Sequence, residues 1–328
     1  MNSNLSNLFI LRSPLQIINA MEAIEHFQLE NNILVLIYNR MKSNTEQMNL
    51  VLDTQKFTNI IHIHEKLKTK YFEYVKLIRK LKKENYNYLF VGELGISYKT
   101  IIANTKKEKV FLLDDGTATI NYYNKFIQYN KYNKYNFREI RFLFSGLNIK
   151  VRDKINLFTY FDLVPLHGID VVKNNLSYLN SNILNNFKKD ETILYFIGQP
   201  IEGTIAFDIY QNSINYLIKK FNKKIIYVPH RSENKEQQDK LLLSIDAEMF
   251  EIINPNMPLE LYFLKNNIYP LHIVSFFSTA LVTLTILFKE CKSNSIRIKE
   301  TVENQKRITK INEVYFIFNK IGIKELDI

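Results

Sequence analysis

The sequence predicts an α/β protein built from two doubly wound domains, each a parallel sheet with helices on both faces. Short apolar runs of strand length alternate with longer stretches of helical period, which is typical of such sheets. The alternation occurs twice, with an asparagine-rich stretch between the two series. A chain of 328 residues is also longer than most proteins with a single hydrophobic core, which favours two domains. The simplest architecture is two domains that face a central cleft.

The first series of elements lies in the first 113 residues. The expected strands are apolar runs at 8–11, 33–38, 57–64, 88–91 and 109–113. The expected helices are amphipathic stretches at 15–27, about 44–53, and 68–83. The stretch 121–136 is rich in Asn, Tyr and Lys without a clear period, and we expect a mobile loop there.

The second series begins after the asparagine-rich stretch 174–186, which is the predicted linker. Its expected strands are 192–197, 224–228, 250–253, 271–274 and 296–301. Its expected helices are 205–221, one that begins at Gln237, 259–265 and 278–289. The predicted domains are therefore residues 1–186 and residues 187–328.

The composition excludes several classes of protein. Apolar residues make up 46% of the chain, which excludes a disordered protein, and the single Cys291 cannot form an internal disulfide. The net charge of +11 comes from lysines spread in many short runs. This pattern favours solvated helix faces, then a basic face for an anionic membrane or substrate, and last a nucleic-acid interface. We therefore expect no nucleic-acid partner.

The sequence shows no signal peptide and no window of about 18–20 apolar residues that would form a membrane helix. The closest stretch, 273–288, carries several Ser and Thr residues and is expected to lie in the protein interior. We expect a cytoplasmic protein whose attachment to the inner face of the membrane, where it occurs, is peripheral.

Several common motifs are missing. There is no glycine fingerprint for dinucleotides and no phosphate-binding glycine–lysine loop, so oxidoreductase and P-loop functions lack support. No Asp-x-Asp occurs, and no cysteine or carboxylate pattern completes a zinc site with His62 and His64. We expect neither a metal nor a cofactor.

Two carboxylates follow the apolar run that ends at Leu113. Asp114 and Asp115 stand at the carboxyl end of a predicted strand, where open α/β sheets place ligand sites. Adjacent carboxylates repel, so the pKa of one can rise until it accepts a proton near neutrality. The alternative interpretation is a plain turn, which Asp115 followed by Gly116 also favours.

His230 and Arg231 follow the predicted strand 224–228. A protonated histidine there could stabilise a departing phosphate, and the arginine could supply a fixed charge. The alternative is a loop histidine beside a surface arginine.

A third group of polar residues surrounds the predicted helix 278–289. Ser275 or Ser278 is expected to cap this helix, whose free N–H groups would form an anion site; a plain cap is the alternative. Upstream, Glu260 begins another predicted helix, where its carboxylate could accept both hydroxyls of a ribose or merely favour the helix dipole.

The last motif follows the first strand of the second series. Gly198, Gln199 and Pro200 form a turn, and Glu202 just beyond it is a second candidate base. The alternative is a tight connection that needs Gly and Pro.

Taken in this order, the motifs resemble the bacterial sialyltransferases of glycosyltransferase family 52, the lipooligosaccharide group. The resemblance covers nearly the whole chain and is carried by residues 12–16, 114–117, 198–200, 229–231, 276–281 and 314–323. It implies a GT-B fold of two Rossmann-like domains. It also implies inverting, metal-independent transfer of sialic acid from CMP-sialic acid to a terminal galactose of lipooligosaccharide or a related glycan, in α-2,3 linkage.

The resemblance also implies roles for individual residues. Asp115 or Asp114 would be the base, or Glu202 would be, and His230 would assist the loss of CMP. Two departures from the family pattern stand out: Ile201 follows the Gly-x-Pro turn directly, and Arg231 replaces a proline. The choice of base therefore stays open. The residues expected to bind CMP-sialic acid and the acceptor are Arg12, Gln16, Gly116, Gly198, Gln199, Pro200, Arg231, Glu260, Ser275, Phe277, Ser278 and Thr279.

Two other functions fit the same motifs. One is a GT-B transferase with another nucleotide-sugar donor or a capsule acceptor. The other is a non-catalytic homologue that binds a nucleotide or a glycan. A homo-oligomer is compatible with the sequence.

Overall fold

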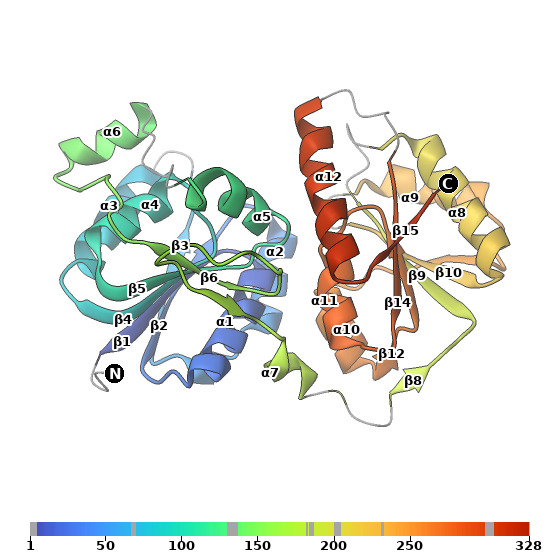
Figure 1. Cartoon of the computed structure of the whole chain (residues 1–328), viewed down its shortest axis with the longest axis horizontal. Coiled ribbons are helices and arrows are strands. Elements are labelled where there is room, and N and C mark those ends of the chain that lie inside the picture. Colours follow the sequence, from blue (N-terminus) through green and yellow to red (C-terminus); the bar gives the residue numbers. More distant parts are fainter. Residues whose placement is uncertain are drawn as a thin grey trace. The chain divides into compact units, whose positions relative to one another are not determined.

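The computed structural model describes residues 5–66, 70–129, 137–181, 183, 187–199, 205–230, 233–298 and 305–327, with side chains of the last segment from 311 on (Figure 1). The chain forms two compact units, Met1–Tyr178 and Leu179–Ile328. Each unit has a parallel sheet with helices packed on it, which confirms the predicted α/β fold class.

The N-terminal unit contains a seven-stranded parallel sheet with the order β3-β2-β1-β4-β5-β6-β7. Its strands are β1 (Ser6–Leu11), β2 (Asn32–Tyr38), β3 (Asn59–His64), β4 (Asn85–Val91), β5 (Lys106–Leu113), β6 (Ile155–Thr159) and β7 (Val171–Lys173). Its helices are α1 (Pro14–Phe27), α2 (Lys42–Val51), η1 (Thr54–Lys56), α3 (Lys70–Leu81), α4 (Ile96–Asn104), α5 (Ala118–Tyr122), η2 (Tyr123–Ile127), α6 (Phe137–Phe144) and α7 (Ser177–Asn180).

Both faces of this sheet are buried, which explains why its central strands are continuously apolar. In β1, Phe9 and Leu11 join a core with α1, whereas Leu8 and Ile10 join a core with α3 and α4. Successive side chains of a strand point to opposite faces, so one apolar run serves both cores.

The C-terminal unit contains a six-stranded parallel sheet with the order β11-β10-β9-β13-β14-β15, and a two-stranded sheet of β8 and β12. Its strands are β8 (Lys188–Lys189), β9 (Ile193–Ile197), β10 (Lys224–Val228), β11 (Phe250–Ile252), β12 (Ile268–Tyr269), β13 (His272–Ser275), β14 (Lys292–Ile296) and β15 (Lys324–Leu326). Its helices are α8 (Phe207–Phe221), α9 (Lys235–Ser244), α10 (Leu259–Lys265), α11 (Ala280–Leu287) and α12 (Gln305–Lys320).

Two expectations about the elements are corrected. The predicted loop 121–136 is helical as far as Ile127, because Tyr123 and Ile127 bury their side chains; residues 130–136 lie outside the described ranges. The strand predicted at 296–301 is β14, at Lys292–Ile296, whose Ser and Asn side chains are polar yet buried. Further elements were not predicted at all: helices α4, α5, α6, α7 and α12, and strands β6, β7, β8, β12 and β15.

Within the described ranges, no helix combines the length and the apolar character needed to cross a bilayer. The stretch 273–288 contributes β13 and α11, and most of its side chains are buried, as expected.

Candidate functional site

The strand order of the N-terminal sheet reverses between β1 and β4, which are neighbours in the sheet. Ligands of open α/β sheets bind outside the carboxyl ends of the strands at such a switch point. The chain leaves β1 at Arg12 and leaves β4 at Gly92 and Glu93. The Arg12 Nη1 atom lies 3.3 Å from Glu93 Oε2, so an ion pair joins the two loops at the switch point.

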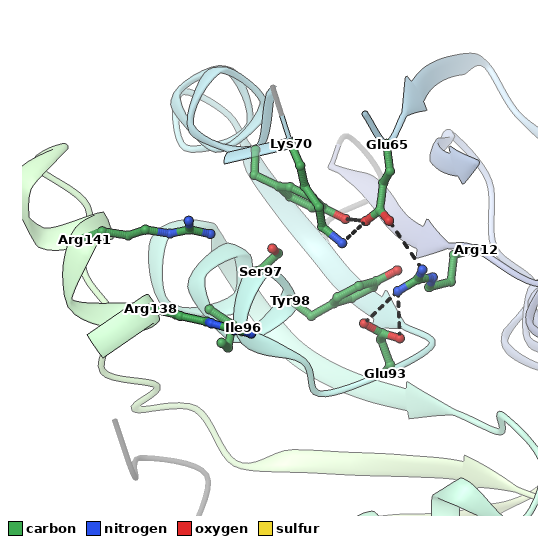
Figure 2. Close-up of a pocket in the computed structure, with 10 residues that line it drawn as sticks. Arg12, Glu65, Lys70, Glu93, Ile96, Ser97, Tyr98, Arg138 and Arg141 are labelled. Carbon is green, nitrogen blue, oxygen red and sulfur yellow. Dashed lines mark hydrogen bonds and ion pairs between the residues drawn. The ribbon is translucent and has the colours of Figure 1, made fainter. Parts of the chain in front are cut away.

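A pocket of about 400 Å³ opens at this point (Figure 2). Arg12 also reaches Glu65 at 3.4 Å, so its guanidinium lies between two carboxylates. Glu65 accepts further hydrogen bonds from the Tyr74 hydroxyl at 2.8 Å and from Lys70 Nζ at 2.7 Å. The pocket is lined by Arg12, Glu65, Lys70, Tyr74, Glu93, Ile96, Ser97, Tyr98, Arg138 and Arg141.

The pocket lining carries more positive than negative charge. Four basic side chains face two carboxyl groups. Burial raises the pKa of Glu93, and the neighbouring Asp115 adds to the rise. Burial also tends to raise the pKa of Glu65. Hydrogen bonds from Lys70 and Tyr74 and the charge of Arg12 outweigh this effect, so the pKa of Glu65 is lowered. The pocket therefore suits an anionic ligand.

Tyr98 adds a neutral donor to this pocket. Its side chain is buried, and its hydroxyl has no hydrogen-bond partner among the residues that the structure describes. Figure 2 shows the ring beside Arg12 with the hydroxyl directed toward the guanidinium. Burial raises the Tyr98 pKa well above its ordinary value, so this hydroxyl keeps its proton. A buried donor without a partner is costly. Because this hydroxyl is closed to solvent, a ligand oxygen satisfies it only where neighbouring side chains move aside.

The two aspartates after β5 have different environments. Asp114 is fully buried: its Oδ1 accepts from the Thr159 hydroxyl and its Oδ2 from the Tyr160 N–H, both at 2.8 Å. Burial raises its pKa to about 7. Asp114 therefore ties β5 to the end of β6 and is sealed from solvent.

Asp115 is half-buried. The Ser13 hydroxyl, next to Arg12, donates to its Oδ1 at 3.2 Å, and its own N–H is bonded to Thr119 Oγ1 at 3.1 Å. Gly116 follows with a backbone φ of +66°, a conformation that residues other than glycine rarely adopt. Of the two aspartates, Asp115 is the one that a substrate can reach, and it lies beside the pocket.

Gln16 is fully buried, and both ends of its side-chain amide are bonded within the unit, which gives it a positioning role; its expected contact with substrate stays a prediction. Its Oε1 accepts from the Arg12 N–H at 2.8 Å, and its Nε2 donates to Gly92 O at 3.1 Å. A Cβ atom at Gly92 would lie 2.1 Å from Gln16 Cδ, so this approach requires glycine. Gln16 thereby holds the two loops that carry Arg12 and Glu93.

The C-terminal sheet has its own switch point, between β9 and β13. Gly198 and Gln199 follow β9, and half-buried Phe277, Ser278 and Thr279 follow β13. These motifs, about 80 residues apart in the sequence, therefore leave neighbouring strands at one edge of the sheet.

The expected serine cap is corrected in part. Ser275 lies within β13, where its hydroxyl donates to Ile197 O on β9 at 2.6 Å, so it does not cap α11. Ser278 Oγ accepts from the Ala280 N–H at 3.3 Å, at the first residue of α11. Ser278 therefore belongs to the helix N-terminus, as expected.

A carboxylate that was not predicted lies behind the turn after β9. Both oxygens of Glu233 lie 2.7 Å from the Tyr227 hydroxyl, and its N–H donates to His230 O at 2.7 Å. Burial raises the pKa of Glu233 to about 7, although hydrogen bonds from Tyr227 and the His230 backbone oppose this rise. A Cβ atom at Gly198 would lie 2.5 Å from the Tyr227 hydroxyl, which explains the glycine.

Two other predicted binding residues of the C-terminal unit, Gln199 and Glu260, make hydrogen bonds within that unit. Gln199 is buried, with its N–H donating to Tyr210 Oη at 2.7 Å and its carbonyl accepting from the same hydroxyl at 2.9 Å. Glu260 is buried in the first turn of α10 and accepts a hydrogen bond from the Thr283 hydroxyl of α11. Burial raises its pKa.

Three predicted residues, Pro200, Glu202 and Arg231, lie outside the described residues. Within the described ranges, no three His, Cys, Asp or Glu side chains gather as a metal site. His62 and His64 stack on Tyr38, with ring centroids 5.7 and 4.8 Å from it.

The sequence model of the alpha-2,8-polysialyltransferase family matches residues 7–297. This match spans the strands from β1 to β14 but not β15, and it includes every motif described above except the C-terminal tail. The chain belongs to the alpha-2,8-polysialyltransferase family. The expected resemblance to bacterial sialyltransferases is thus confirmed at that level. The family 52 subgroup and its α-2,3 linkage are not, since the matching family is named for α-2,8 linkage.

Solved structures with a similar fold include sialyltransferases. A Photobacterium damselae sialyltransferase, residues 113–497 corresponding to its GT-B domain, has a TM-score of 0.50 at 11% identity, covering 98% of this chain and 99% of that one. A Photobacterium damsela sialyltransferase has a TM-score of 0.53 at 11% identity, with coverages of 98% and 81%. UDP-GlcNAc 2-epimerase from Methanocaldococcus jannaschii has a TM-score of 0.52 at 15% identity, with coverages of 95% and 92%.

These structures confirm the GT-B fold for this polysialyltransferase-family chain. They include an epimerase as well as sialyltransferases, so the fold alone does not decide the reaction. The family match identifies the protein as a sialyltransferase. No curated protein matches the sequence significantly.

Proposed function

We propose that this sialyltransferase transfers sialic acid from CMP-sialic acid to a hydroxyl of a glycan that itself ends in sialic acid. Sialyl transfer rests on the family; the donor, the acceptor and the roles of the residues are our proposal. The observation that supports an acceptor ending in sialic acid is the excess of basic side chains in the pocket beside Asp115. A terminal galactose, the acceptor expected from the sequence, is neutral: its hydroxyls accept hydrogen bonds from these cations but offer no opposite charge. A terminal sialic acid offers a carboxylate, which arginine binds well.

In this reaction Asp115 acts as the base. The acceptor hydroxyl forms a bond to the anomeric carbon of the donor sugar, while the bond from that carbon to the CMP phosphate oxygen breaks. Asp115 removes the hydroxyl proton as the new bond forms, a contribution of roughly 10²–10⁴-fold. Its half-buried position and its hydrogen bond from Ser13 support this role. Asp114 is sealed beneath it and supports the turn instead.

The C-terminal unit is the proposed donor site. The phosphate of CMP gains charge as it leaves, and free N–H groups at the start of α11, near Ser278, stabilise such a charge. His230 is half-buried and follows β10, where a protonated imidazole would add a positive charge. Glu260 is the proposed partner of the ribose, with Thr283 holding its carboxylate in place.

The experiment is to measure CMP release from CMP-sialic acid in the presence of EDTA, with lactose, with sialyllactose and without acceptor. We expect sialyllactose to stimulate release more than lactose. We expect Arg141→Ala to raise the KM for sialyllactose about tenfold, equivalent to ~1.4 kcal/mol. Arg152→Ala is the matched control, because Arg152 is an exposed arginine of the same unit that does not line the pocket.

Two outcomes would contradict parts of the proposal. Turnover with lactose but not with sialyllactose would reject the anionic acceptor and restore the galactose acceptor. Turnover of another nucleotide sugar, without CMP release from CMP-sialic acid, would reject the donor.

A further inference from the structure

Helix α6 of the N-terminal unit turns its apolar side toward solvent. Phe137 and Phe144 are 85% and 87% exposed, and Ile140 and Leu143 are exposed beside them. The side chains that this helix buries are Glu139 and Phe142. Surface helices of globular proteins ordinarily do the reverse, and gathered exposed apolar groups mark a surface that binds a partner or a membrane.

The helix is held firmly in this orientation. Phe142 packs on Tyr71 of α3 with ring centroids 5.0 Å apart, and the Tyr71 hydroxyl donates to Arg141 O at 2.8 Å. Arg79 of α3 donates to Ser145 O, just beyond α6, at 3.1 Å. The outward apolar side therefore follows from the packing of α6 on α4, where Glu139 pairs with Lys99, and from these contacts with α3 (Figure 1).

The exposed side of α3, the helix beside α6, is basic. Phe72, Lys76, Arg79 and Lys80 are exposed and recur at a spacing that places them on one face of the helix, and exposed Lys83 follows just beyond its end. The carboxylates nearby are fewer: Glu73 is half-buried, Glu84 lies near the Tyr86 hydroxyl, and Glu139 is paired with Lys99 beneath α6. Lysines around exposed aromatic groups are the pattern that anionic bilayers bind.

We propose that this α3/α6 surface docks on an anionic phospholipid bilayer. Phe137, Ile140 and Phe144 enter the headgroup region, and the lysines of α3 pair with lipid phosphates. A second copy of the chain fits the surface less well, because two facing copies would bring Lys76, Lys80 and Lys83 of both together.

Docking has a consequence for the acceptor. Arg138 and Arg141 belong to the same helix and line the pocket (Figure 2). The docked helix therefore places the pocket beside the membrane, which suits an acceptor glycan carried on a lipid. The docking itself goes beyond the proposed function and does not depend on it.

The test is sedimentation of the full chain with phosphatidylcholine vesicles that contain or lack phosphatidylglycerol. We expect binding to the anionic vesicles, and a loss on the order of a hundredfold in affinity for the double variant Phe137→Ser/Phe144→Ser. Lys76→Glu/Lys80→Glu should weaken binding and reduce its sensitivity to salt. Leu243→Ser is the matched control, since Leu243 is an 89% exposed apolar residue on α9 of the other unit.

The proposal is overturned if the wild type ignores anionic vesicles, or if the double phenylalanine variant binds them as the wild type does. It is also overturned if light scattering shows a dimer that this variant dissociates, which would assign the surface to a second copy. CMP release with a soluble acceptor should be unchanged in the double variant. That readout separates a failure of docking from a failure of the proposed function.

Discussion

The Ser13 hydroxyl donates a hydrogen bond of 3.2 Å to the Asp115 carboxylate, although 102 residues separate the two in the sequence. Ser13 is also the N-cap of α1, where its Oγ accepts from the Gln16 N–H at 3.3 Å. One side chain thus begins a helix at the end of β1 and positions a carboxylate at the end of β5. It joins the proposed base to the loop that carries Arg12.

Asp115→Asn should abolish base function without unfolding the protein. We expect CMP release in the presence of acceptor to fall by roughly 10²–10⁴-fold, because the amide cannot accept the hydroxyl proton. The melting temperature should stay close to that of the wild type, since Asp115 is only half-buried. Full activity in Asp115→Asn would move the role of base to another carboxylate, and Glu202→Gln would then be the variant to compare.

Ser13→Ala should act through Asp115. We expect a lower kcat with a smaller change in the KM for CMP-sialic acid, together with about 1 kcal/mol of lost stability from the missing cap. Ser13→Thr keeps a hydroxyl and is the control. Equal loss of kcat in both variants would show that the hydrogen bond to Asp115 is not what matters.

The fully buried Asp114 should make stability depend on pH. Burial raises its pKa to about 7 in the folded protein, above the value of about 3.9 in an unfolded chain. The folded state therefore holds this proton more tightly. The resulting stability is present below about pH 4 and is lost as the pH rises through 7. The full effect is on the order of a few kcal/mol.

Asp114→Asn removes this dependence, because the amide is neutral at every pH. Measured as urea unfolding between pH 4 and pH 8, the wild type should lose stability relative to the variant as the pH rises. The Thr159 hydroxyl and the Tyr160 N–H can still bond the amide, so the variant should fold. Parallel curves for the two proteins would mean that Asp114 does not titrate in this range.

The fold was predictable where strands are buried on both faces by apolar side chains. Strand β1 ends in an uninterrupted apolar run, residues 8–11, and the strand predicted there was confirmed. Strand β14 was misplaced because Ser293, Asn294 and Ser295 are buried with their polar groups; the Ser293 hydroxyl, for example, is bonded to Thr285. Hydropathy cannot distinguish a polar residue satisfied inside a sheet from one in a loop.

The candidate site was predictable only where a motif follows a strand. Asp115 carried this signal, and so did Glu93, which stands two residues after the end of β4 and could have been found in the same way. Arg138, Arg141 and Lys70 could not, because α3 and α6 lie far apart in the sequence and only their packing brings these cations to one pocket. Glu233 was also missed, since a lone glutamate in a loop carries no pattern.

Glu233 should affect the pH dependence of donor use. Burial raises its pKa to about 7, and its carboxylate and N–H are both bonded to the His230 backbone. An ionised Glu233 favours positive charge nearby, so we expect kcat/KM for CMP-sialic acid to fall as the pH drops through 7 and Glu233 takes up a proton. This fall is the acidic limb of the pH profile. In Glu233→Gln the limb should disappear, because the lower kcat/KM should be present at high pH as well.

Tyr227→Phe is the companion variant, because it removes the hydroxyl that lies 2.7 Å from the Glu233 carboxylate. That hydrogen bond lowers the Glu233 pKa, so its loss should move the limb to higher pH. An unchanged limb in both variants would assign it to another group.

Tyr98 and Tyr74 form a matched pair that separates binding from stability. Both rings are buried and line the pocket, but the Tyr74 hydroxyl donates to Glu65 at 2.8 Å, whereas that of Tyr98 has no partner within the described part of the chain. Removing a satisfied buried hydroxyl costs roughly 1 kcal/mol or more, and removing an unsatisfied one relieves a penalty of similar size. Tyr74→Phe should therefore lower stability, and Tyr98→Phe should leave it unchanged or raise it.

For Tyr98→Phe, acceptor binding should weaken even though stability does not fall. If its hydroxyl donates to an acceptor oxygen, the variant should raise the KM for sialyllactose about tenfold while its melting temperature holds or increases. The KM for CMP-sialic acid serves as the internal control, because the donor is assigned to the other unit. A stabilised variant with an unchanged acceptor KM would remove Tyr98 from the acceptor site, and a destabilised one would show that the hydroxyl is already satisfied in the free protein.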